Sequence, residues 1–495
     1  MTNGCSFFTW DRKKEYGVVG VAALVYWLAM FFAEGRAFEP GAAAQRLPTY
    51  IAVKLCSLLC IWLLLMFFIR AAREWKSGGP VIGTLQYMLP VFCLVTSFWA
   101  ISNAYPFGEG DQQNILMAAQ CFDNLGGFFH YLTTSIPMVA MLIFPSGGFA
   151  VVFKIFLTSM GAGYCVYRLG RLIPRWSALL LYLPFLLPPG FYMSYNIHRC
   201  PMYAVLYLVY ACLLVCDSLE GKRLTRGRFA LLSVLTAVLT QWRVEGIYLL
   251  IMGPILLYTV YRPKLDRKGK ALALTVMMAA QLMVYFPQKL ETNAVTDSAN
   301  RSLPLFQYLI TNMERKGLDK EKNAEDLAIV DQYLSVDEIH LRNEQYGDYM
   351  YGDNLIIYFG LRPGAGREAE DAFIRAVIRI VLKNPMVYIR TQLGAWSYVS
   401  TAFHHERKLD ELANILQNLY VPTAWLLVSW IWLLVKKKWA IWLMTSCHLI
   451  HMAITTALLP ASYFKYYYSE YLYAAFSAIL ILSLFVQAGK KKPIQ

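Results

Sequence analysis

Long apolar stretches separated by short basic turns run through the chain from one end to the other. A helix needs about 20 apolar residues to cross a bilayer, and stretches near that length recur throughout the sequence. The clear ones are 17–33, 51–69, 81–101, 148–167, 176–193, 201–217, 271–287, 419–435, 439–459 and 469–487. This pattern predicts an all-α polytopic membrane protein.

Residues 229–260 form an apolar stretch that differs from the others, because polar residues interrupt it at QWRVEG, 241–246. Each apolar half has only about 13 residues, which is short for a full crossing. Both ends adjoin basic clusters, so we expect a hairpin of two short helices with Arg243 and Glu245 at its tip. Short membrane helices with polar tips often mark binding sites. Counting this pair, we expect a bundle of about 12 membrane helices, two of them short.

Basic clusters give the orientation, because cytoplasmic loops carry an excess of Lys and Arg. They lie at 11–14, 70–76, 168–175, 221–228, 261–270, 436–438 and 490–492. Placing all of them inside predicts that both termini are cytoplasmic. The apolar segment 130–144 is short and contains Pro137, so we expect residues 125–145 to form an interfacial ledge on the outer face.

The same parity places residues 288–418 outside, as a small extracytoplasmic subdomain followed by interfacial helices. The amphipathic stretch 372–403 is interrupted at Asn384-Pro385 and is predicted to be an interfacial helix pair. The predicted organisation has four parts. They are two accessory membrane helices (1–80), a membrane core (81–287) with an acidic outer loop at 102–128, the outer region 288–418, and a C-terminal three-helix membrane segment (419–495).

Composition agrees with this reading. The chain of 495 residues is 57% hydrophobic and 16% charged, whereas soluble domains are about one quarter charged. The net charge of +14 does not indicate a nucleic-acid partner, because the basic residues lie between apolar runs. Among the ten cysteines, Cys121 and Cys200 fall on the predicted outer side and could pair. The spacing predicts no metal site, since His404 and His405 have no evident third ligand.

The acidic outer loop carries Glu109, Asp111 and Asp123 close to a membrane helix end. Carboxylates at that depth are costly unless they are paired or functional. Asp111 directly precedes a helical pattern starting at Gln112, so helix capping is a second reading for it.

Four short motifs resemble the GT-C superfamily of integral-membrane glycosyltransferases, which use polyprenyl-phosphate-linked sugars; bacterial mannosyltransferases and dolichyl-phosphate-mannose-protein mannosyltransferases are examples. The motifs are GDQQNILMAA (110–119), QWRVEGIYLL (241–250), KNPMVYIR (383–390) and PASYFKYYYSEYLY (460–473). Their order matches the superfamily over roughly residues 81–487. The resemblance implies a GT-C-like bundle and a transferase that moves a sugar to an extracytoplasmic glycan, lipid or protein.

The resemblance also implies roles for individual residues. Asp111 would be the general base, with Glu109 as a second acid. Three cations would bind the donor phosphate, namely Arg243, Lys465 and Arg199, with Glu245, His198 and Tyr466 in support. No cofactor is required by this reading, and a divalent cation stays open.

Other readings remain open from the sequence. Arg243 and Glu245 could simply neutralise each other, and Lys465 could extend to lipid headgroups. Tyr466, Tyr467 and Tyr468 could belong to an interfacial aromatic belt. The chain could also be a transporter or flippase of lipid-linked glycan, or a polysaccharide polymerase. In every case we expect a multi-pass protein surrounded by membrane lipids, most simply in a bacterial plasma membrane.

Overall fold

A computed structural model describes residues 13–101, 111–124, 129–262, 267–291, 303–347, 360–362, 366–401, 415–458 and 463–490. The first half of the chain contains α1 (Lys13–Met30), η2 (Phe31–Arg36), α2 (Ala42–Gln45), α3 (Leu47–Glu74), α4 (Pro80–Ile101), α5 (Asp111–Gln120), α6 (Leu132–Ile143), α7 (Gly147–Leu169), α8 (Arg175–Leu179), η3 (Leu180–Tyr182), α9 (Leu183–Leu186), α10 (Pro188–Tyr195), α11 (Arg199–Leu219) and α12 (Arg226–Trp242). The second half contains η4 (Val244–Gly246), α13 (Leu249–Tyr261), α14 (Arg267–Glu291), α15 (Leu303–Arg315), α16 (Ala324–Asp331), α17 (Val336–Tyr346), α19 (Arg367–Lys383), α20 (Pro385–Thr401), α22 (Tyr420–Val435), α23 (Trp439–Leu458), η7 (Phe464–Tyr466) and α24 (Tyr468–Lys490).

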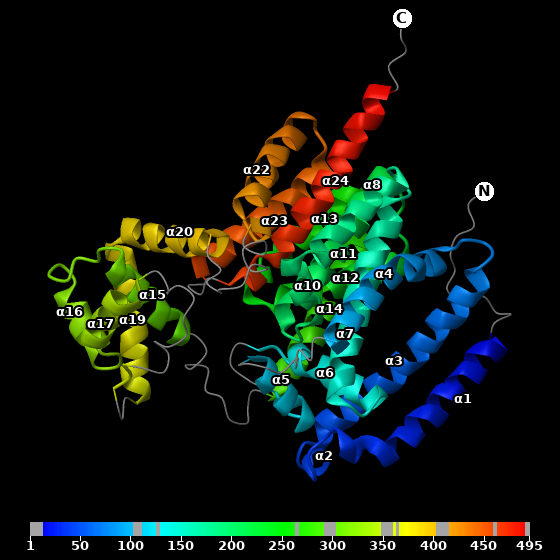
Figure 1. Cartoon of the computed structure of the whole chain (residues 1–495), viewed down its shortest axis with the longest axis horizontal. Coiled ribbons are helices and arrows are strands. Elements are labelled where there is room, and N and C mark those ends of the chain that lie inside the picture. The colour runs from blue at the N-terminus through cyan, green and yellow to red at the C-terminus, as the bar shows by residue number, and fades with distance from the viewer. Residues whose placement is uncertain are drawn as a thin grey trace, which may run out of the picture.

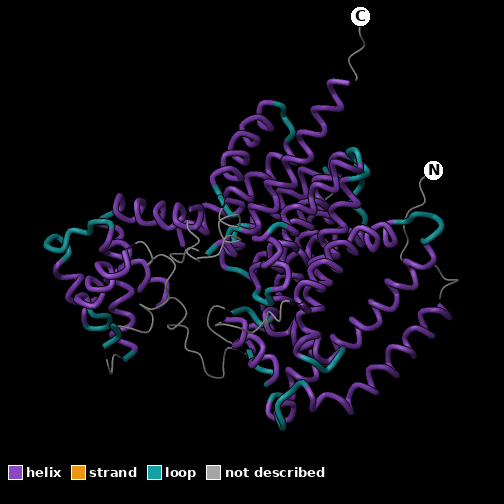
Figure 2. The backbone as a smooth tube through the Cα atoms, in the orientation of Figure 1, coloured by secondary structure: helices purple, strands orange, loops and turns teal. Residues whose placement is uncertain are grey.

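The described residues form an all-helical protein without a named strand (Figure 2). Eight of their helices are long and apolar enough to cross a membrane, or up to nine if one bent pair counts as a single span. Three further apolar helices are shorter, at 10–17 residues. The described residues therefore confirm the prediction of an all-α protein, and their apolar helices agree with the prediction of a multi-pass membrane protein.

The segment expected as one span at 176–193 is a bent pair instead. Its two parts, Arg175–Leu186 and Pro188–Tyr195, meet at an angle of 70°. Leu187 has an extended backbone (φ −74°, ψ 153°), as a residue before proline prefers. A Cβ at Gly190 would lie 1.7 Å from the carbonyl oxygen of Pro184, so only glycine permits this close approach of the two parts.

Four helix ends meet at Asp217, which lies near the end of α11 and is 1% exposed. Arg168 at the end of α7 donates to its carboxylate at 2.9 Å, and Arg228 near the start of α12 donates at 3.2 Å. Tyr261 at the end of α13 donates at 2.6 Å. The start of α12 and the end of α13 therefore lie at the same end of α11, as a hairpin requires.

The break predicted within 229–260 is confirmed at QWRVEG. Helix α12 ends at Trp242, and Arg243 adopts an extended backbone with φ −134° and ψ 142°. A single 3₁₀ turn, η4, follows before α13 begins. A Cβ at Gly246 would lie 1.9 Å from the carbonyl oxygen of Leu239, so glycine lets the returning chain pack directly against α12.

Helix α6 occupies the segment predicted as an interfacial ledge. It has 12 residues, most of them buried, and it contacts α3, α5 and α7. Its length is too short to cross a bilayer. Most of its surface packs against other helices, so α6 is mainly a packed helix of the bundle and not a lipid-facing interfacial helix. Figure 1 shows it between α3 and α7.

A second hydrophobic core lies outside the main bundle and is built from α15, α16, α17 and α19. Figure 1 shows these helices beside the bundle, with α20 running between the two. The predicted interruption of 372–403 is confirmed, because α19 ends at Lys383 and α20 begins at Pro385. The Asn384 amide donates to the carbonyl of Ile380 at 2.8 Å, which satisfies a helix-end acceptor.

Candidate functional site

Arg243 and Glu245 form a buried ion pair at the tip of the hairpin. Arg243 Nε donates to Glu245 Oε2 at 3.1 Å, and Nη2 donates to Oε1 at 2.5 Å. Each residue is 3% exposed. Arg243 Nη1 also contacts the sulfur of Cys200 at the start of α11. The structural pairing considered for these two residues is therefore present, and it anchors the tip to the end of α11 opposite Asp217.

The last loop reaches the same place. The ring of Tyr466, in η7, lies 5.1 Å from the guanidinium carbon of Arg243 and 5.4 Å from the ammonium of Lys465. The Lys465 ammonium also lies 4.9 Å from the ring of Tyr463. Cations within about 6 Å of an aromatic face are attracted to it. Residues more than 200 positions apart in sequence thus meet around one tyrosine.

His198 and Arg199 hold the beginning of α11. The Nδ1 atom of His198 accepts a hydrogen bond from the backbone N–H of Cys200 at 3.2 Å, so the imidazole caps this helix. The guanidinium carbon of Arg199 lies 4.7 Å from the ring of Phe129, which precedes α6. Arg199 is partly buried, with its guanidinium against this ring.

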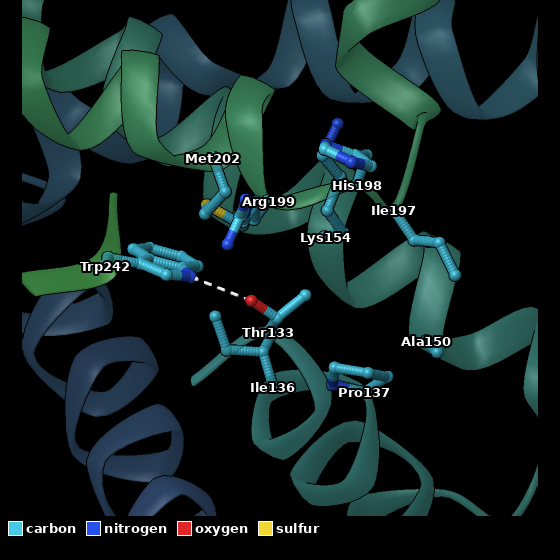
Figure 3. Close-up of a pocket in the computed structure, with 10 residues that line it drawn as sticks. All are labelled: Thr133, Ile136, Pro137, Ala150, Lys154, Ile197, His198, Arg199, Met202 and Trp242. Carbon is cyan, nitrogen blue, oxygen red and sulfur yellow. Dashed lines mark hydrogen bonds between the residues drawn. The ribbon is translucent and has the colours of Figure 1, made fainter. Parts of the chain in front are cut away.

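A cavity opens beside Arg199, between α6, α7 and the start of α11 (Figure 3). Its space, counted with its mouth, is about 310 Å³. The lining residues are Thr133, Ile136, Pro137, Ala150, Lys154, Ile197, His198, Arg199, Met202 and Trp242. Trp242 Nε1 donates to Thr133 Oγ1 at 3.2 Å and closes one wall. The ionisable side chains of this lining are one lysine, one arginine and one histidine, with no carboxylate among them.

The structure leaves the predicted base undescribed. Asp111 is the first residue of α5, but its side chain and the whole of Glu109 lie outside the described residues, as do His404 and His405. Asp123 accepts a hydrogen bond from Arg46 at 2.9 Å and another from the backbone of Asn124 at 2.8 Å.

Two expectations about the outer face are wrong. Cys121 is exposed and Cys200 is buried, and both are free thiols, because the Cys200 sulfur is turned toward Arg243 inside the bundle. Tyr467 and Tyr468 are also buried and do not form an interfacial belt. The Tyr468 hydroxyl donates to the carbonyl of Pro184 at 3.2 Å.

A titratable cluster deep in the bundle was not foreseen. His451 Nδ1 lies 2.6 Å from Glu470 Oε1, and both residues are at most 2% exposed. The His448 ring is stacked between Tyr207 and Tyr473, with centroids 4.1 and 4.0 Å away. The signal in the sequence was polar residues within apolar runs, which usually have a role.

Lys154 was also missed, although it is a lone lysine in an apolar span. It is 3% exposed, and its ammonium donates to the backbone carbonyl of Met193 in α10. Among the described residues, no group of three or more His, Cys, Asp and Glu side chains could hold a metal ion.

Comparisons with known protein families, with curated proteins and with solved structures find no match to this chain.

Proposed function

We propose that this protein is a membrane glycosyltransferase that transfers a sugar from a polyprenyl-phosphate carrier to an extracytoplasmic acceptor. The observation that carries the proposal is the meeting of Arg199, Arg243 and Lys465 at one end of α11. They come from three separate parts of the chain. Arg243 is buried and the other two are partly buried. Charged side chains inside a membrane protein are costly and usually serve a ligand or a partner, and arginine is the preferred partner of phosphate.

The proposed reaction uses the acidic loop that contains Asp111. Asp111 takes the proton of the acceptor hydroxyl as its oxygen forms a bond with the anomeric carbon. The bond from that carbon to the carrier phosphate breaks, and its electron pair goes to the phosphate oxygen. The attack passes through a state of oxocarbenium character. Arg199, Arg243 and Lys465 stabilise the phosphate that leaves, with Glu245, His198 and Tyr466 holding them in place and Glu109 as a second acid.

The proposed topology follows from charge. Basic residues 168–175 and 221–228 adjoin the helix ends joined at Asp217, whereas the Arg243 pair lies at the other end of α11. With basic ends cytoplasmic, the Arg243 end and the α15–α19 core face outward. This proposal has both termini inside and about 12 membrane helices, counting the short α12 and α13.

A flippase of lipid-linked glycan is the second candidate, and the His451–Glu470 pair favours it. Buried titratable groups in membrane bundles often belong to proton relays. A flippase moves the carrier and leaves every glycosidic bond intact, whereas a transferase produces a new bond and free carrier phosphate.

The deciding experiment is a profile of surface glycans and lipid-linked sugars in cells with and without the gene. For a transferase, loss of the gene removes a sugar from the acceptor and leaves the sugar-loaded carrier on the outer leaflet. Loaded carrier retained on the inner leaflet would identify a flippase and contradict the transferase.

A further inference from the structure

Lys154 is a buried cation without an acidic partner. It lies midway along the first half of α7, a helix long and apolar enough to cross a membrane. Its ammonium has the Met193 carbonyl as its hydrogen-bond acceptor, and no described carboxylate lies within ion-pair distance. Other buried cations here are compensated: Lys54 pairs with Glu34, Arg168 with Asp217 and Arg243 with Glu245.

Lys154 and Arg199 line the same cavity. Figure 3 shows Arg199 of α11 directed toward Thr133 of α6, whereas the Lys154 side chain rises from α7 beside His198. Two positive groups that line one cavity both favour a negative charge within it. The Thr133 hydroxyl and the Trp242 N–H add polar groups to the wall. Apart from His198, the rest of the lining is apolar, and low-polarity surroundings strengthen the attraction of an anion.

We propose that this cavity is an anion-binding site, with Lys154 as its deepest cation, and that it takes a carboxylate or a phosphate group. The first part of this proposal, that the cavity binds an anion, does not depend on the proposed function. The second part, that the anion belongs to the sugar donor, rests on the proposed function. The donor would place in the cavity either its carrier phosphate or an acidic group on the sugar itself, and the two sources can be separated by the anion that binds.

The test uses the full chain purified in detergent and measures thermal unfolding against ligand concentration. The probes are sodium phosphate and sodium glucuronate, with sodium chloride at matched ionic strength and neutral glucose as controls. A ligand that binds only the folded protein raises the midpoint in a saturable way, which yields its Kd. Phosphate binding points to the carrier, and glucuronate binding points to an acidic sugar; either supports the site.

Variants locate the binding. Lys154→Met should raise the Kd of the bound anion by about tenfold or more, the scale of losing one charged hydrogen bond. Lys465→Met makes the same chemical change in the neighbouring Tyr466 group and should have a smaller effect. Lys154→Gln replaces Lys154→Met if the latter does not fold. No stabilisation beyond chloride, or an effect of Lys154→Met no larger than that of Lys465→Met, would overturn the proposal. Because this experiment measures anion binding and no sugar transfer, its result can still be interpreted if the transferase proposal fails.

Discussion

The guanidinium of Arg243 holds both carboxylate oxygens of Glu245, two residues further along the chain and equally buried. The extended backbone of Arg243 and the turn at Val244–Gly246 bring the two side chains together. The same guanidinium contacts Cys200 and lies against Tyr466. One pair thus fixes the hairpin tip, the start of α11 and the last loop relative to one another.

Breaking this pair from one side should be strongly destabilising. Glu245→Gln leaves the Arg243 charge buried without its counter-ion, which typically costs about 3–5 kcal/mol. We expect that loss in the free energy of unfolding, measured by chemical denaturation in detergent.

Replacing both partners separates structure from function. The double variant Arg243→Met with Glu245→Leu removes both buried charges, and such replacements are often neutral for stability. We expect near-native stability together with a raised requirement for donor lipid. Native donor dependence in a stably folded double variant would return the pair to a purely structural role.

The proposed topology predicts where reporters fused to the chain will be found. Fusions after residue 145 and after residue 320 should be active only as extracytoplasmic reporters, whereas a fusion after residue 437, in the KKK turn between α22 and α23, should be cytoplasmic. Paired alkaline phosphatase and green fluorescent protein fusions measure both states. Cytoplasmic fluorescence from the fusion at 320 would contradict the orientation of the α15–α19 core.

Local sequence predicted the two helix interruptions, at QWRVEG and at Asn384-Pro385, because each depends on residues within one short stretch. It did not predict the bend at Leu187 or the burial of α6, since these depend on close packing, as at Gly190 against Pro184. The contacts of Lys154 and Asp217 join helices that are distant in sequence. Periodicity marks which residues are unusual in an apolar helix, but it does not show which partner they meet.

The α15–α19 core should lose stability in acid through Glu314. Burial alone would raise the pKa of this carboxyl, but hydrogen bonds from Lys320, Asn343 and His340 outweigh it and hold the pKa below its usual 4.5. A depressed folded-state pKa contributes stability above the unfolded value, and this contribution disappears as pH falls through the folded value. Limited proteolysis of this region should therefore accelerate below about pH 4.5. Glu314→Gln should remove that part of the pH dependence, and an unchanged acid response in this variant would exclude Glu314 as its source.

Asp111→Asn tests the proposed base without disturbing the helix that Asp111 begins. Asparagine has about the same helix propensity as aspartate, so α5 should still start at the same residue, but an amide cannot accept the acceptor's proton. We expect the rate of sugar transfer to fall by about 10²–10⁴-fold, the usual contribution of a general base. The assay follows transfer from a labelled carrier in membranes containing equal amounts of each full-length variant. Glu109→Gln is the matched control, since it removes the other carboxylate of the loop and should cost less. Transfer by Asp111→Asn at the native rate would exclude Asp111 as the base, and a larger loss in Glu109→Gln would assign that role to Glu109.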